Sequence, residues 1–265
     1  MTTRAALLIE YHGGGFVGWQ SQASGLAVQD VLEAAASRLV GGAPVPSWVA
    51  GRTDAGVHAE GQVALLELPT PFPLLRLRQA LNFHMKPHPV VVLRVAAAPE
   101  GWHPRFDATG RAYRYRILNR RPRPALLAGL VWHVPHTLDA AAMHAAAQTL
   151  LGRHDFSAFR AAACQASSPL RTLDRLDVTR QGEVMQGEVI EIVAAARSFL
   201  HHQVRNMVGT LALVGAGRWP VARVAEVLAG GDRRQSGPTA PPEGLSLTAV
   251  RYARDPFAEP QEETP

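Results

Sequence analysis

The sequence predicts an α+β fold made of two ferredoxin-like βαββαβ halves with a cleft between them. Hydrophobic residues make up 47% of the 265 residues and charged residues 18%, so the chain can bury substantial cores. Apolar periodicity gives the order strand, helix, strand, strand, helix, strand across residues 4–98. The same order returns across residues 111–252, without any repeat of the residues themselves.

In the first half, each element has its own signal. Runs of apolar residues predict strands, and apolar residues that recur three and four positions apart predict helices. Proline-rich "PTPFP" after residue 68 breaks the chain. The expected strands are 4–11, 47–50, 62–68 and 89–98, and the expected helices are 28–39 and 74–83.

In the second half, Gly152 stops the first helix and Pro220 starts the last one. The expected strands are 111–118, 172–180, 188–196 and 245–252, and the expected helices are 139–151, 199–215 and 220–231. Residues 152–171 are long for a connection in a compact domain, which predicts a binding loop. Residues 230–244 are rich in glycine and proline and are expected to be flexible and partly basic.

These elements predict an N-terminal half at 1–105, which carries the Asp54 loop, and a C-terminal half at 106–253. An acidic, proline-containing tail at 254–265 is expected to be disordered. The single cysteine, Cys164, excludes an internal disulfide and a cysteine-rich zinc site. No apolar run is long enough for a signal peptide or a membrane span, so we expect a cytoplasmic protein without a membrane partner.

The charge balance predicts a polyanionic partner. The formal net charge is +5 and the pI is near 10.1. Lys86 is the only lysine, so the positive charge is carried by arginine, whose flat donor fork suits phosphates and stacks on bases.

The stretch "GRTDAGVH" places Asp54 in a turn bounded by glycines, with Arg52 and His58 nearby. An Asp-x-Gly sequence is common in turns, where the aspartate caps its own backbone. The other interpretation is a catalytic carboxylate beside cationic groups. The local sequence alone leaves both open.

Two cofactor sites are considered and rejected. "GGGFVG" at 13–18 fits the dinucleotide-binding pattern, but the next helix starts only near Ala27, too late to face a pyrophosphate. Asp54, His58, His201 and His202 are metal-ligand types, but adjacent histidines on a helix diverge by about 100°. We therefore expect neither a nucleotide cofactor nor a metal.

"RAYRYR" at 111–116 alternates with period two, so Arg111, Tyr113 and Tyr115 share one face of a strand. These residues could simply form a half-buried strand, or they could form a stacking platform for single-stranded RNA. Basic "NRRPRP" follows and favours RNA. Arg205, in an apolar helix, either extends to solvent or meets a buried anion.

Taken together, six segments resemble the successive signatures of the tRNA pseudouridine synthase A family, from about Arg4 to Tyr252. They are "GGFVGWQ" (14–20), "GRTDAGVHA" (51–59), "WHPRFDATGRAYRYRI" (102–117), "DFSAFR" (155–160), "FLHHQVRNMVG" (199–209) and "EGLSLTAV" (243–250). The chain departs from the family pattern at His12, Ala112 and Ser167, which concerns RNA contacts more than chemistry.

The resemblance implies the pseudouridine synthase fold with a positively charged cleft, a homodimer and no cofactor. It implies isomerisation of uridine to pseudouridine in the tRNA anticodon stem-loop, at tRNA positions 38, 39 and 40. Asp54 would be the catalytic aspartate, Tyr113 the stacking tyrosine and Arg205 the partner of Asp54. Substrate contacts are expected from Tyr113, Arg52, His58, Trp102, His103, Arg105, Phe106, Arg111, Cys164 and Gln165. A non-catalytic RNA-binding module and a metal-dependent nuclease are the alternatives.

Overall fold

The computed structural model of the chain describes residues 2–183 and 188–258. Its contacts divide the chain into two compact units. The first unit contains residues 1–109 and 249–265, and the second contains residues 110–248. Strands and helices coexist in both units, which confirms the predicted α+β class.

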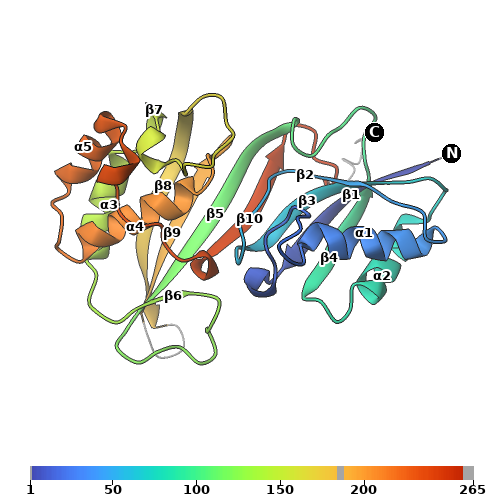
Figure 1. The fold of residues 1–265 in the computed structure, drawn as a ribbon, viewed down its shortest axis with the longest axis horizontal. Helices are drawn as coiled ribbons and strands as arrows, with labels where there is room; N and C mark the ends of the chain where they lie inside the picture. Colours follow the sequence, from blue (N-terminus) through green and yellow to red (C-terminus); the bar gives the residue numbers. More distant parts are fainter. Residues whose placement is uncertain (1, 184–187, 259–265) are drawn as a thin grey trace, which may run out of the picture. The chain divides into compact units, whose positions relative to one another are not determined.

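The first unit follows the order β1 (Thr3–Tyr11), α1 (Val28–Leu39), β2 (Ser47–Val49), β3 (His58–Leu68), α2 (Leu74–His84) and β4 (Val90–Ala97). Its sheet has the strand order β4–β1–β3–β2, and each neighbouring pair is antiparallel. Helices α1 and α2 contact one another, and Figure 1 shows them side by side.

Both faces of this sheet are covered, which explains the apolar run from Ala5 to Ile9 in the middle of β1. Alternate residues of β1 point to opposite faces, and Leu7 and Ile9 are fully buried. On the other face, Ala6 belongs to a core cluster with Ala50, Val63, Leu65, Trp102 and Phe257. Because both faces of the sheet are buried, the strands of this unit are held in place, and so are the ends of the loops that connect them.

The second unit contains β5 (Ala108–Asn119), β6 (Trp132–Val134), α3 (Ala140–Gln148), β7 (Gly152–Asp155), β8 (Leu170–Glu183), β9 (Glu188–Ala196), α4 (Gln203–Gly215), α5 (Ala222–Gly230) and β10 (Leu245–Tyr252). The strand order is β10–β5–β9–β8–β7, and β6 pairs in parallel with β5. The last four residues of β10 belong to the first unit. Figure 1 shows α3, α4 and α5 gathered beside β8, in agreement with the contacts of α3.

Most predicted elements are confirmed, and the differences are local. The strands β6 and β7 were not predicted, because three or four residues carry too little periodicity. The helix expected from 199 begins at Gln203, because His202 adopts the left-handed conformation at φ 62° and interrupts the helix. The segment expected to be flexible at 230–244 contains two short 3-10 helices and many side-chain hydrogen bonds.

The tail also differs from its prediction over its first residues. Disorder was expected from residue 254, yet Phe257 is 9% exposed and its carbonyl accepts a hydrogen bond from Arg94. The remaining tail residues, 259–265, lie outside the described part of the chain. No helix within the described ranges is long and apolar enough to span a membrane.

Candidate active site

Asp54 lies on the loop between β2 and β3 and is half-buried. Its carbonyl accepts a hydrogen bond from the N–H of Val57 at 3.1 Å, which closes the turn, and Gly56 takes φ 78°. The turn predicted from "GRTDAGVH" is therefore present. The closing bond itself uses the backbone of Asp54 and not its carboxylate.

The glycine loop 13–18 supports the Asp54 loop from within the same unit. The N–H of Trp19 donates to the carbonyl of Thr53 at 3.1 Å, and Gly56 donates to Phe16 at 3.3 Å. Gly18 has φ 111°, and a Cβ there would lie 2.6 Å from the carbonyl oxygen of Thr53. The glycines of "GGGFVG" thus allow close approach of two backbones, and the next helix starts at Val28.

A buried polar cluster fixes the start of the Asp54 loop. The hydroxyls of Tyr11 and Thr53 lie 2.7 Å apart, and Gln62 donates to the carbonyl of Gly51 at 2.8 Å. Burial raises the pKa of Tyr11 to about 12, although hydrogen bonds with Thr53 and Gln62 act in the opposite direction. The phenol therefore stays protonated at neutral pH. Neither Tyr11 nor Gln62 could be identified from the sequence, because both lie in strands whose pattern looks purely structural.

His58 is 4% exposed, and its Nδ1 atom accepts a hydrogen bond from the N–H of Gly13 at 2.9 Å. Its ring also contacts the ring of His12 edge-on, with centroids 4.6 Å apart. Two residues beside Asp54 were expected to contact RNA. Arg52 is exposed and its contact stays a prediction, whereas His58 is buried and supports the glycine loop.

The segment 102–106 separates into a buried and an exposed part. Trp102 is 4% exposed and packs on Tyr252, so its burial does not suit the RNA contact expected of it. Phe106 is 73% exposed, its ring lies 4.4 Å from that of His103, and the Arg105 guanidinium lies 5.9 Å from its centroid. Burial lowers the pKa of His103, and Arg105 and Arg4 lower it further against the effect of Asp107. This combination of ring, cation and neutral imidazole is a suitable stacking surface for nucleic acid.

In the second unit, Tyr113 is half-buried on β5, opposite Ala194 of β9. Its ring meets that of Phe199 nearly perpendicularly, at 89° and 5.2 Å, which fixes its tilt. Phe199 was not identified from the sequence, because it lies in an apolar run that resembles a helix core. Arg111 donates to the carbonyl of Arg197 at 2.5 Å. Tyr115, on the same strand face, is fully buried and donates to the carbonyl of Pro241 at 2.8 Å.

Arg205 lies on the first turn of α4 and is half-buried. Its Nε atom donates to the carbonyl of Ala240 at 2.8 Å, and the N–H of Ala240 donates back to the carbonyl of Arg205 at 3.1 Å. The side chain therefore does not simply extend into solvent. Its guanidinium is oriented by a neighbouring backbone segment.

His201 and His202 do not lie on a helix, so the prediction that they diverge by about 100° around one is wrong. Both residues precede α4, and His202 has φ 62°. Their ring centroids lie 4.0 Å apart. The expectation that no metal takes part is left without that support and stays a prediction.

Cys164 and Gln165 lie on a connection that Arg160 organises. Arg160 donates to the carbonyls of Cys164 at 2.6 Å and of Ala166 at 2.8 Å. Burial raises the pKa of the Cys164 thiol, but backbone hydrogen bonds from Ala166 and His201 and the charge of Arg160 outweigh it, so the pKa is lowered. Cys164 is half-buried and Gln165 is exposed. Within the long binding loop predicted at 152–171, residues 160–166 are thus held together by the side chain of Arg160.

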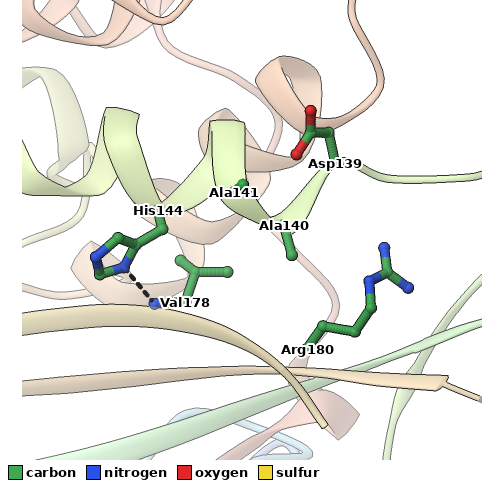
Figure 2. A pocket seen from close by; sticks show the side chains of 6 residues that line it. All are labelled: Asp139, Ala140, Ala141, His144, Val178 and Arg180. Atoms are coloured by element: carbon green, nitrogen blue, oxygen red, sulfur yellow. Dashed lines mark hydrogen bonds between the residues drawn. The ribbon is translucent and has the colours of Figure 1, made fainter. Parts of the chain in front are cut away.

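A pocket of about 470 Å³ lies where α3 begins, beside β8 (Figure 2). It is lined by Asp139, Ala140, Ala141, His144, Val178 and Arg180. Asp139 caps α3 by accepting from Ala142, and His144 accepts from the N–H of Val178 at 3.2 Å. These polar groups already serve the packing of α3 on β8, and none of the predicted site residues lines this pocket.

The predicted site residues are divided between the two units. Asp54, Arg52, His58, Trp102, His103, Arg105 and Phe106 belong to the first unit, and Tyr113, Arg205, Arg111, Cys164 and Gln165 belong to the second. Within the first unit, the glycine loop, Tyr11 and Gln62 form hydrogen bonds to the Asp54 loop. Within the second, Phe199 contacts Tyr113, and Ala240 binds Arg205.

Comparisons with known proteins find similar chains over nearly the whole length of this one. A family model described as tRNA pseudouridine synthase matches residues 146–253. The chain is 68% identical to a tRNA pseudouridine synthase A of Acidiphilium cryptum (strain JF-5), over 96% of this chain and 98% of the relative. It is 56% identical to the protein of that name from Paramagnetospirillum magneticum (strain ATCC 700264 / AMB-1), over 94% and 95%. It is 53% identical to that from Gluconobacter oxydans (strain 621H), over 96% and 91%.

Proposed function

This chain belongs to the tRNA pseudouridine synthase A family of isomerases, which convert uridine to pseudouridine in tRNA, and we propose that Asp54 is its catalytic carboxylate. We propose further that its target is the anticodon stem-loop, at tRNA positions 38, 39 and 40. The observation that carries the proposal is the Asp54 loop, which the glycine loop holds through backbone hydrogen bonds and which Tyr11 and Gln62 hold through their side chains.

The reaction breaks the bond between C1′ of the ribose and N1 of uracil and forms a bond from C1′ to C5. N1 finishes with a proton and C5 loses its own, so substrate and product are isomers and the overall balance needs no oxidant or energy source. A carboxylate can assist by bonding covalently to the substrate, or by removing a proton from the sugar to give a glycal. Both routes require Asp54 to be ionised.

Arg205 and Tyr113 have supporting roles in this proposal. A guanidinium beside a carboxylate favours its charged form and can fix it with two parallel hydrogen bonds. Arg205 is suited to that role because the backbone of Ala240 already orients its Nε. A uridine leaves the helical stack at a cost of a few kcal/mol, and stacking on an aromatic ring returns about 1–3 kcal/mol. Tyr113 is suited to receive the base because Phe199 fixes its tilt.

We also propose that the two halves are ferredoxin-like and that a positively charged cleft between them receives the RNA. The strand order β4–β1–β3–β2 of the first unit and the order β10–β5–β9–β8 of the second support this proposal, because both match the split βαβ arrangement. The net charge of +5 supports RNA binding, as do the exposed Arg105 and Phe106 with the His103 ring beside Phe106. Arg52 and Gln165 are exposed and suited to contact it directly.

The experiment that tests this function is to incubate an unmodified tRNA transcript with the protein and to map pseudouridine along it. The proposal expects pseudouridine at tRNA positions 38, 39 or 40 and at no position outside the anticodon stem-loop. Modification elsewhere would contradict the proposed target. Repeating the reaction in excess chelator with a prefolded transcript tests the expectation that no metal takes part.

The homodimer follows only from the family resemblance, and the cytoplasmic location follows from the lack of a long apolar run in the sequence; both stay predictions. Sedimentation of the full chain, with and without tRNA, measures the first. Cell fractionation measures the second.

A further inference from the structure

Helix α4 is buried nearly all round, although it carries several polar residues. Gln203, Asn206 and Thr210 are at most 1% exposed. Part of this burial comes from residues 232–240, which lie directly on the helix. A Cβ on Gly209 would lie 1.8 Å from the carbonyl oxygen of Pro238, so the two backbones meet at van der Waals distance.

Arg233 ties this segment to itself and to α4 with both terminal nitrogens of its guanidinium. One nitrogen donates to the Ser236 hydroxyl at 2.7 Å and to the carbonyl of Gly237 at 2.9 Å. The other donates to the Asn206 side-chain oxygen at 3.1 Å and to the Thr239 hydroxyl at 3.0 Å. Burial lowers the pKa of Arg233, yet a guanidinium stays charged at any ordinary pH.

Thr239 and Asn206 complete the network. The Thr239 hydroxyl donates to the Asn206 side-chain oxygen at 2.7 Å, and the Asn206 amide donates to the carbonyl of Phe159 at 2.8 Å. On the neighbouring turn of α4, the hydroxyl of Thr210 accepts from the N–H of Gly237 at 2.9 Å. The position of Thr239 is therefore fixed by several bonds to side chains that are themselves fixed.

Ala240 is the next residue in the chain, and it is the one that touches Arg205. Its carbonyl accepts from the Nε of Arg205 at 2.8 Å, and its N–H donates to the carbonyl of Arg205 at 3.1 Å. Ala240 is 1% exposed, so water does not compete for these groups. Whatever displaces Thr239 also displaces the acceptor that orients the Arg205 guanidinium.

We propose that residues 232–240 set the working orientation of Arg205, with Arg233 and Thr239 as positioning residues for the reaction. This inference rests on the proposed role of Arg205 beside Asp54. A guanidinium that bonds through Nε to a fixed carbonyl loses rotation about its last bonds, so its two terminal nitrogens face one direction. A segment whose composition resembles a flexible linker thereby acts as a rigid clamp.

The test uses the full-length protein and a tRNA transcript under single-turnover conditions. Thr239→Val removes the hydroxyl with little change of shape, and Thr239→Ser keeps it. Thr149→Val is the matched control, because it removes one part-buried hydroxyl bond of the same unit, from Thr149 to the carbonyl of Ala146, away from this network. Each variant is made in the wild-type background and with Arg205→Lys, whose amine lacks the Nε donor.

For Thr239→Val we expect the single-turnover rate constant to fall roughly three- to tenfold, with the Kd for tRNA unchanged. Thr239→Ser and Thr149→Val should keep the wild-type rate. In the Arg205→Lys background, Thr239→Val should lower the rate constant by less than about a further twofold. The bond from the Arg205 Nε to the Ala240 carbonyl, which Thr239 positions, is already absent there. Should Thr239→Val fail to fold, Ser236→Ala removes another partner of Arg233 and takes its place.

A wild-type rate for Thr239→Val together with a slow Arg205→Lys enzyme would overturn the positioning role while leaving the role of Arg205 intact. The positioning role would also be overturned if the effects of Thr239→Val and Arg205→Lys on the rate constant were fully additive. A wild-type rate for Arg205→Lys would instead remove the proposed role of Arg205, and this inference with it.

Discussion

The Nδ1 atom of His58 accepts a hydrogen bond from the backbone N–H of Gly13 at 2.9 Å, inside the first unit. This bond joins the first residue of β3 to the glycine loop that supports Asp54. A residue of the aspartate signature thus acts on the neighbouring loop. His58→Leu should leave the buried N–H of Gly13 unsatisfied and lower the free energy of unfolding by about 1–3 kcal/mol.

His58→Asn is the matched variant, because its amide oxygen can take the place of Nδ1 as acceptor. We expect it to recover most of the stability and turnover that His58→Leu loses, measured by urea unfolding and single-turnover rates. If tRNA affinity alone changed in both variants and stability did not, His58 would be an RNA contact, as the family resemblance implied.

Gly13 and Gly15 differ sharply in the space around them. A Cβ on Gly13 would lie 2.1 Å from the carbonyl oxygen of Val57, whereas a Cβ on Gly15 would have no neighbour within 4 Å. Gly13→Ala should therefore push the two loops apart, at a cost of about 1–3 kcal/mol in stability, and should slow turnover. Gly15→Ala should leave both quantities near wild type. Equal effects of the two substitutions would show that the contact with Val57 does not matter.

Phe106 and Phe83 are a pair for testing the RNA surface, because they are 73% and 68% exposed. Phe106 has both a histidine ring and an arginine guanidinium against its ring, whereas Phe83 has the ring of His84. Phe106→Ala should weaken tRNA binding by about 1–3 kcal/mol with no change in Tm. Phe83→Ala, on α2, should leave tRNA binding unchanged. Filter binding at one fixed salt concentration measures both, and equal losses would contradict a specific role for Phe106.

Because its pKa is raised, Tyr11 should make the free energy of unfolding fall at high pH. Its pKa is raised to about 12, whereas an unfolded tyrosine titrates near pH 10. The folded protein therefore holds the proton more tightly, so this contribution is complete below pH 10 and is lost between about pH 10 and 12, at roughly 1.4 kcal/mol per pH unit. Urea unfolding at about pH 9 and about pH 11 measures the loss.

Tyr11→Phe should flatten this decline between pH 10 and 12 without abolishing it. Burial also raises the pKa of Tyr115, which contributes in the same direction and stays in the variant. An unchanged slope in Tyr11→Phe would show that Tyr11 titrates at its ordinary pKa.

The order and type of the long elements were predictable, because each rests on local periodicity. Helix α1, for example, covers the predicted range 28–39 and buries Val28, Val31, Leu32 and Ala35. The burial of Trp102, within the segment 102–106, was not predictable. Trp102 and Phe106 look alike in a basic stretch, but only Trp102 meets the small side chains of Ala6 and Ala50, which leave room for its ring.

The C-terminal connection shows a second reason why sequence falls short. Residues 230–244 have a composition typical of flexible loops, yet Arg233 bonds to Asn206, 27 residues away. Such non-local bonds leave no mark in composition or periodicity. The same holds for His202, whose left-handed backbone starts α4 four residues later than apolar periodicity suggests.

The central claim is that Asp54 is the catalytic carboxylate and not merely a turn residue. The most direct measurement is the single-turnover yield of pseudouridine for Asp54→Asn on an unmodified tRNA transcript, with tRNA affinity and Tm determined on the same preparation. The turn closes through the backbone of Asp54, so the variant should fold and bind tRNA within a few-fold of wild type. Its yield should be at background level. Substantial pseudouridine formation by a folded Asp54→Asn protein would contradict the claim.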